Sequence, residues 1–138
     1  MTMHEVKTRF AGGMAFEAEK DGQIVRMDAA ENEGGMNTGF RPKPLLLASL
    51  TGCTGMDVVS LLEKMRVQFS DFEMKIKAEL GDEHPKQYES IELEYVVKVA
   101  EDDKPKFEKA VKLSQEKYCG VSAMLAKVAP IKIVITWL

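Results

Sequence analysis

The stretch GFRPKPLLLASLTGCTGMDVVSLLEKMR, residues 39 to 66, decides the fold of this chain. Its leucine, valine and methionine side chains fall on almost every side of a wheel with 3.6 residues per turn. This pattern predicts one long helix that is buried nearly all round. Pro42 and Pro44 set its start, because proline is tolerated in a first helical turn but not in a helix interior. A membrane span is disfavoured, because Asp57 near its centre would cost about 2.5 to 3.5 kcal/mol to insert.

Small residues surround Cys53 in the middle of this helix, namely Ala48, Ser49, Gly52 and Gly55. A glycine inside a helix costs roughly 1 kcal/mol relative to alanine. We therefore expect a second chain or a substrate to approach the helix closely at this point. Most free cysteines are small buried hydrophobes, and for Cys53 that interpretation stays open beside a reactive one.

Composition places the chain among ordinary globular proteins. It has 138 residues, of which 45% are hydrophobic and 30% charged, so we expect a single domain over residues 1–138. No positively charged segment followed by an apolar run opens the chain, which favours a cytoplasmic location. The net charge of −3 and the lack of a basic cluster disfavour a nucleic-acid partner. Two cysteines in a reducing compartment indicate inert or redox-active thiols rather than a permanent disulfide.

Short strands are expected on both sides of the central helix. Residues 4–28 predict three antiparallel strands, with the pair Asp21-Gly22 as a hairpin turn, and residues 29–44 predict a polar surface loop. Alternating apolar residues predict two half-buried strands at 72–76 and 91–99, joined by a turn at residues 81–87. His84 lies in that turn with no partner at metal-ligand spacing, so we expect a solvated histidine and no metal site.

The last third of the chain predicts helices followed by a strand. Asp103 and Pro105 signal the start of an amphipathic helix that runs to about Tyr118. A short second helix follows, and Cys119 near its N-terminus is expected to have a lowered pKa. Residues 131–137 predict a final strand. The fold class is therefore α+β, with an antiparallel sheet packed on a long buried central helix. A homodimer would supply the cover that a helix apolar on all sides needs.

Two segments of the chain, LLLASLTGCTGMDVVSLL at 45–62 and SQEKYCGVSAMLAKV at 114–128, resemble the OsmC/Ohr family of osmotically inducible and organic hydroperoxide resistance proteins. The resemblance extends over essentially the whole chain and is closest to the YhfA-like branch. It implies an OsmC-like fold, an intertwined homodimer whose central helices pack together, and two active sites at the subunit interface. It also implies reduction of organic hydroperoxides, with Cys53 as the peroxidatic and Cys119 as the resolving cysteine.

That chemistry agrees with what two thiols can do. A thiolate reduces a peroxide and becomes a sulfenic acid, and a second thiol condenses with it to a disulfide. No metal or bound cofactor is needed, but an external dithiol reductant must restore the thiols. Two other functions stay open: binding of a small apolar ligand in a dimer-interface pocket, and thiol chemistry with another small apolar electrophile.

The chain departs from the family pattern at the residues that activate the thiolate. Active members of the hydroperoxide branch carry a glutamate at the position of Lys43 and an arginine at the position of Lys20. Two lysines do not form that ion pair. Arg41 is a possible substitute cation, and its other interpretation is an exposed loop charge. Asp57, one turn after Cys53, is expected to raise the pKa of that thiol if it faces the same way, or to cap a helix or make a buried hydrogen bond.

Overall fold

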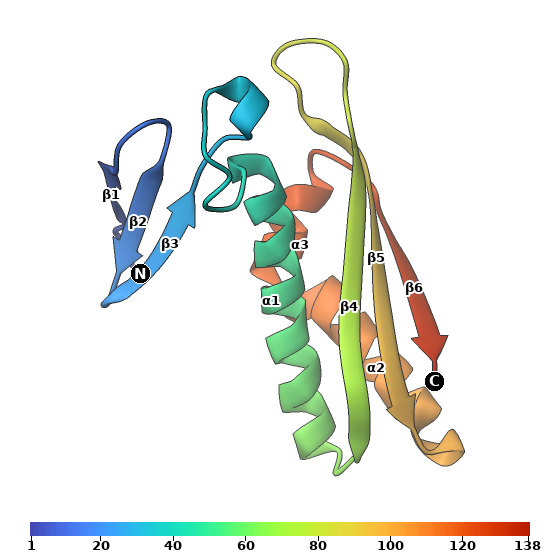
Figure 1. Cartoon of the computed structure of the whole chain (residues 1–138). Coiled ribbons are helices and arrows are strands. Elements are labelled where there is room, and N and C mark those ends of the chain that lie inside the picture. The colour runs from blue at the N-terminus through green and yellow to red at the C-terminus, as the bar shows by residue number, and fades with distance from the viewer. The chain divides into compact units, whose positions relative to one another are not determined.

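The computed structural model describes all 138 residues, which form two compact units, Met1–Leu46 and Leu47–Leu138. The first unit contains an antiparallel sheet in the order β1-β2-β3, built from β1 (Lys7–Phe10), β2 (Phe16–Lys20) and β3 (Gln23–Met27) (Figure 1). Asp21 and Gly22 join β2 to β3 with φ of 52° and 79°. Positive φ at both central residues is the geometry that a two-residue hairpin requires. The predicted strands and hairpin are confirmed.

The polar loop after β3 is organised around the carboxylate of Asp28. This carboxylate accepts hydrogen bonds from the backbone N–H groups of Ala29, Met36 and Thr38 and from the Thr38 hydroxyl. The Thr38 hydroxyl is the largest reason why the pKa of Asp28 falls to about 2. A 3-10 turn, Glu31–Glu33, lies within the loop. Local side-chain bonds therefore order a segment that the sequence shows only as polar.

Helix α1 (Pro42–Lys64) begins at the first of the two predicted prolines and continues into the second unit. It ends two residues before Arg66, whose φ of 56° is left-handed. The expected burial nearly all round is wrong for the single chain, since Met56 is 76% exposed. One sheet covers only one side of a helix. The buried residues of α1 are Leu50, Thr54, Gly55, Val58 and Leu62.

The second unit contains a sheet in the order β4-β5-β6, built from β4 (Phe69–Leu80), β5 (Tyr88–Val99) and β6 (Ile131–Trp137). Strands β4 and β5 are antiparallel, but β6 runs parallel to β5. The expectation of an antiparallel sheet is therefore wrong at this pair. The helices α2 (Lys104–Leu113) and α3 (Gly120–Ala126) connect β5 to β6 and carry the chain back along the sheet (Figure 1). A parallel pair requires such a crossover.

One face of β5 forms the centre of the core. Its alternate side chains are almost fully buried, as the predicted alternation requires. The ring of Phe107 from α2 contacts those of Tyr95 and Trp137 in edge-to-face geometry. Helix α1, the sheet and α2 thus share one apolar core, which includes Leu50, Leu62, Leu93, Val97 and Val111.

A π-helical turn, Ser114–Tyr118, connects α2 directly to Cys119. The helix that the sequence predicts up to Tyr118 is therefore continuous, but it changes pitch at Ser114. Single π turns of this kind are frequent at functional sites.

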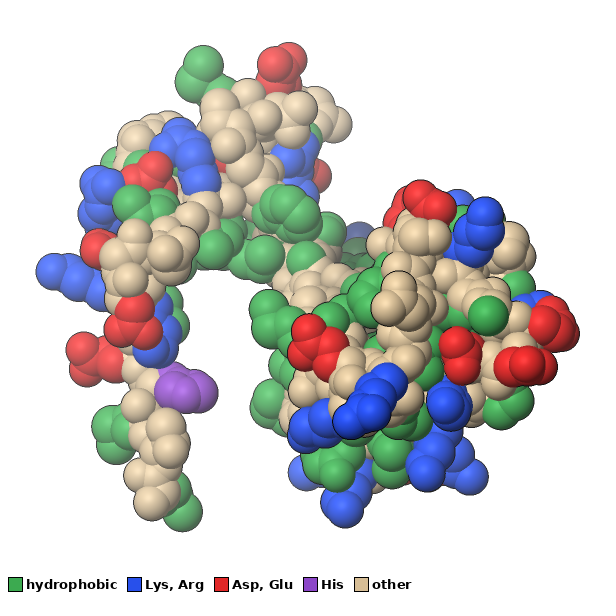
Figure 2. Space-filling view, turned by 90° about the horizontal axis from the view of Figure 1, so that it is seen from below, with side chains coloured by type: hydrophobic (Ala, Val, Ile, Leu, Met, Phe, Trp, Pro, Cys, Tyr) green, Lys and Arg blue, Asp and Glu red, His purple; other side chains and the backbone are tan.

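Helix α1 is the one helix that is long and apolar enough to cross a membrane by length and composition, a property that core helices of soluble proteins share. Charged and hydrophobic side chains are interspersed on the face of the protein that Figure 2 shows. The exposed hydrophobic residues of the second unit include Met56, Tyr118 and Met124.

Candidate active site

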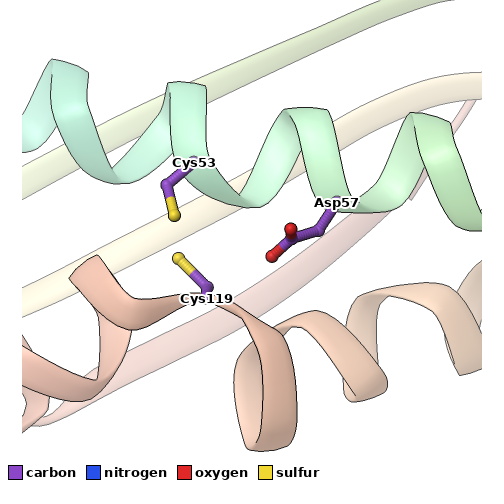
Figure 3. A group of neighbouring side chains, drawn as sticks. All are labelled: Cys53, Asp57 and Cys119. Carbon is purple, nitrogen blue, oxygen red and sulfur yellow. The ribbon is translucent and has the colours of Figure 1, made fainter. Parts of the chain in front are cut away.

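The two cysteines lie side by side in the second unit. Cys53 comes from the middle of α1 and is partly buried, whereas Cys119 precedes α3 and is only 3% exposed. Both are free thiols. The two sulfurs and one carboxylate oxygen of Asp57 all lie within 4.8 Å of one another. Figure 3 shows the three side chains converging from α1 and from the segment before α3.

Cys119 is the N-cap of α3, and its Sγ accepts a hydrogen bond from the backbone N–H of Ser122 at 3.3 Å. The predicted position at a helix N-terminus is confirmed. The predicted lowering of its pKa is wrong, because burial and the neighbouring Cys53 thiol raise the pKa of Cys119 to about 11. The Ser122 N–H opposes this rise. Loss of hydration outweighs the cap at this buried sulfur.

Asp57 faces the thiols from one helical turn away. Its Oδ2 accepts a hydrogen bond from the Ser114 hydroxyl at 3.0 Å. No ion pair of the chain includes Asp57. Asp57 makes the partly buried hydrogen bond that one interpretation predicts, and its charge contributes to the raised pKa of Cys119. The expectation for the Cys53 thiol stays a prediction. Its spacing of four residues from Cys53 is the signal that places both on one helix face.

The buried hydroxyl group of Thr54 holds Ser114, the hydrogen-bond partner of Asp57, in place. The Thr54 hydroxyl lies 2.7 Å from the Ser114 hydroxyl and 2.6 Å from the Tyr95 hydroxyl. Thr54 and Ser114 are both fully buried. These bonds join α1 to β5 and to the π turn. Sequence analysis missed this cluster, although a threonine and a serine at core positions are its signal.

Gln115 extends the same network to α3. Its Nε2 donates to the Tyr95 hydroxyl at 3.0 Å, and its Oε1 accepts from the Ser122 hydroxyl at 2.6 Å. Ser122 in turn holds Cys119 through its backbone N–H. Hydrogen bonds therefore position both the carboxylate of Asp57 and the sulfur of Cys119, and no buried side-chain polar atom is left without a partner.

The three basic residues singled out in the sequence lie in the first unit. Lys20 pairs with Asp21 at 2.6 Å. Arg41 donates from Nη1 to Asn37 Oδ1 and to the Gly39 carbonyl. Lys43 is exposed in the first turn of α1. Because the thiols belong to the second unit, a role of these cations in activating Cys53 stays a prediction.

A groove of about 490 Å³ runs along α1 beside β4. At Gly55 the close approach expected from the sequence is made by the chain itself, since an added Cβ would lie 2.6 Å from Met74 Cε. At Gly52 an added Cβ would meet nothing within 4 Å. Gly52 therefore faces open space in the single chain. The groove is lined by Thr51, Gly52, Gly55, Met56, Val59, Ser60, Glu63, Phe72 and Met74.

Cys53, Asp57 and Cys119 are also the one group of cysteine, histidine and carboxylate side chains close enough to share a metal ion. Neither histidine belongs to it. His84, which the sequence predicts in a solvated loop, is exposed between β4 and β5.

Comparison with known proteins places this site in a family. The family model described as OsmC-like protein matches residues 34–134, a range that contains both cysteines and Asp57. The chain belongs to the OsmC-like family. Protein YhfA of Escherichia coli (strain K12) is 32% identical over 124 residues, which cover 89% of this chain and 90% of YhfA.

Solved structures share the fold of this chain. A hypothetical protein from Aquifex aeolicus VF5 superposes with a TM-score of 0.84 and 33% identity, covering 100% of this chain and 99% of that one. An organic hydroperoxide resistance protein from Elizabethkingia anophelis superposes with a TM-score of 0.72 and 15% identity, covering 99% of each chain. At that identity the second likeness shows the fold alone.

Proposed function

We propose that this OsmC-like protein is a cysteine-based peroxidase that reduces organic hydroperoxides. The observation that carries the proposal is the convergence of two free thiols within 4.8 Å in a chain of this family. Organic hydroperoxide resistance proteins share its fold, which adds support.

Cys53 is the better candidate for the attack on the peroxide, because it is more exposed than Cys119 and because burial keeps the Cys119 thiol protonated. The Cys53 thiolate attacks the terminal peroxide oxygen, and the O–O bond breaks. The alkoxide leaves and takes up a proton from the solvent to become the alcohol. Cys53 is then a sulfenic acid. Cys119 attacks its sulfur, a disulfide forms, and water is released. An external dithiol reduces the disulfide, and a reducing compartment such as the cytoplasm would suit that step.

The cations and the assembly form part of the same proposal. Lys43, Arg41 and Lys20 are the candidates that hold the Cys53 thiolate or bind the substrate. The exposed side of α1 and the open space at Gly52 support a homodimer in which single OsmC-like domains pack through their central helices. Replacing Lys43 by Met in a Cys119→Ser background is expected to slow alkylation of Cys53 by less than about tenfold, because an exposed charge contributes at most roughly 1 kcal/mol. An unchanged alkylation rate would mean that Arg41 or Lys20, rather than Lys43, stabilises the Cys53 thiolate.

A second candidate function is binding of a small apolar molecule without turnover. The groove beside α1 favours it, since Met56, Val59, Phe72 and Met74 line that groove. Both functions are compatible with the fold, so an activity assay has to distinguish the peroxidase from the binding protein.

Consumption of cumene hydroperoxide with a lipoyl dithiol as reductant tests the proposal. We expect turnover in the parent, none in Cys53→Ser, and in Cys119→Ser a sulfenic acid on Cys53 that dimedone traps with the corresponding gain in mass. Absence of both turnover and a dimedone adduct would reject the peroxidase. Retention of an apolar ligand by that inactive protein would support the binding function.

A further inference from the structure

We propose that Asp57 carries the proton from the Cys119 thiol to the hydroxyl group that leaves Cys53 when the disulfide forms. This inference rests on the proposed peroxidase function and assigns a catalytic residue to its second step. The two cysteines provide the sulfurs and the leaving hydroxyl of that step, but not the base that takes the Cys119 proton as its sulfur attacks.

The position of Asp57 suits this role. One of its carboxylate oxygens lies within 4.8 Å of both sulfurs, a span that a small side-chain movement or one bridging water closes. The Ser114 hydroxyl holds Oδ2, and Ser114 is itself fixed by the buried hydroxyl of Thr54. The backbone N–H of Cys119 donates to the Ser114 carbonyl at 2.8 Å. The same serine therefore fixes the carboxylate and the segment that bears the resolving sulfur.

The second step needs a proton acceptor because Cys119 is buried. Burial raises the pKa of its thiol to about 11, so at neutral pH the attacking group is a protonated thiol. The titratable groups next to Asp57 are Cys53 on α1, Cys119 before α3 and Tyr95 on β5. Burial also raises the pKa of Tyr95, which keeps the phenol neutral. Asp57 makes no ion pair that would occupy its charge, so it is the base that remains.

The step balances in atoms and charge. As the bond between Cys119 Sγ and Cys53 Sγ forms, the Cys119 proton moves to Asp57. The bond between sulfur and oxygen on Cys53 breaks, and the departing hydroxide takes the proton from Asp57 and leaves as water. Asp57 returns to its carboxylate form, and the only oxidant is the organic hydroperoxide that produced the sulfenic acid.

Two reactions with different leaving groups distinguish a proton-carrying role of Asp57 from a merely structural one. The first reaction is disulfide formation from the sulfenic acid. The protein is mixed rapidly with cumene hydroperoxide, the reaction is quenched at set times, and the intact mass of the protein shows how much disulfide has formed. The second uses Ellman's disulfide, with which Cys53 forms a mixed disulfide that Cys119 then attacks. That attack releases thionitrobenzoate, which leaves as a stable anion and needs no proton.

In Asp57→Asn we expect disulfide formation from the sulfenic acid to slow by about a hundredfold or more, the usual contribution of general acid–base catalysis. Its residual rate should rise with pH, whereas the parent rate stays flat near neutrality. Attack on the mixed disulfide should slow less, because that step needs a base for the Cys119 proton but no acid for the leaving group. This slowing should disappear as pH rises toward 11, where the thiol ionises without a base. Glu108→Gln, which removes an exposed carboxylate on α2 outside the groove and the cysteine site, is the control and should change neither reaction.

Slowing of both reactions by equal factors that do not change with pH would mean that Asp57 only holds the site together and would overturn the proposal. An unchanged rate of disulfide formation from the sulfenic acid would also overturn it, while leaving the peroxidase function intact. If Cys119→Ser forms no sulfenic acid with the hydroperoxide, the peroxidase function itself fails, and the role of Asp57 fails with it.

Discussion

At the scale of the residue, Cys119 shows how burial overrides a favourable local motif. Its position at the start of α3 and the bond from the Ser122 N–H both favour a thiolate. The sulfur is nevertheless almost completely removed from water, and its pKa rises to about 11. A short helix of seven residues offers little to offset that loss of hydration.

The raised pKa makes stability depend on alkaline pH. A thiol whose pKa rises from 9.0 to about 11 on folding binds its proton more tightly in the folded state. Its contribution is complete below pH 9 and is lost as pH rises toward 11. We expect the free energy of unfolding, measured with urea, to fall in this window, and Cys119→Ser to remove the part of the decline that begins near pH 9. Burial of Tyr95 should leave a decline that begins nearer pH 10. An identical pH profile in Cys119→Ser would contradict the raised pKa.

Thr54 is the residue on which the buried polar network depends. Replacement by valine keeps the shape but deprives the Tyr95 and Ser114 hydroxyls of a partner. We expect a loss of about 1 to 3 kcal/mol in the free energy of unfolding. Thr51→Val is the matched control, because the Thr51 hydroxyl bonds only to the Ala48 carbonyl of its own helix. That variant should stay within about 0.5 kcal/mol of the parent, and equal losses in both variants would argue against a special role for the network.

At the scale of the element, the loop after β3 owes its order to one carboxylate. Asp28 accepts four hydrogen bonds that hold residues 29–38 in place. Helix α1 begins a few residues after this loop.

Asp28→Asn is expected to loosen that loop. The amide presents one acceptor oxygen instead of two and loses the charge that strengthens these bonds. The parent should lose stability as pH falls from 3.8 toward 2, because its folded carboxyl keeps a pKa of about 2, and the variant should lack this dependence. Hydrogen exchange at residues 29–38 measures the effect. Asp21→Asn, in an exposed turn, serves as the control, and equal protection in parent and Asp28→Asn would refute the assignment.

At the scale of the whole molecule, the unusual feature is a long apolar helix with one side uncovered. Met56 is 76% exposed, and Gly52 faces open space. A second copy of the chain would cover this side.

Gly52→Ala distinguishes the single chain from the proposed homodimer. In a single chain the added methyl meets nothing within 4 Å, so the variant should gain up to roughly 1 kcal/mol of helix stability. Where the central helix of a partner packs on Gly52, the same methyl should instead weaken the dimer. We expect the parent to sediment at twice the chain mass of 15.4 kDa. The Gly52→Ala dimer should be weaker, so that it is already dissociated at protein concentrations at which the parent is still a dimer.

Gly120→Ala is the control for that experiment, because Gly120 also faces open space but lies at the start of α3. It should leave the sedimentation mass unchanged. A parent that sediments at 15.4 kDa at micromolar concentration would reject the homodimer.

Much of this protein follows from the sequence by itself. Alternation and the Asp21-Gly22 turn determine the strands, and the apolar run after Pro42 determines α1. These features depend on neighbours a few residues apart. The pattern around the two cysteines, together with the resemblance to the OsmC/Ohr family, also pointed to the pair of thiols.

Only the tertiary structure decided which groups share the site and what surrounds them. The parallel pairing of β6, the one-sided burial of α1 and the raised pKa of Cys119 depend on segments far apart in the chain. The periodicity of the sequence does not predict that Ser114 donates a hydrogen bond to Asp57. It also does not predict that the Thr54 hydroxyl bonds to those of Tyr95 and Ser114. Desolvation and hydrogen bonding are set by whatever packs nearby, and at Cys119 the fold buried a sulfur whose position at a helix end by itself favours the thiolate.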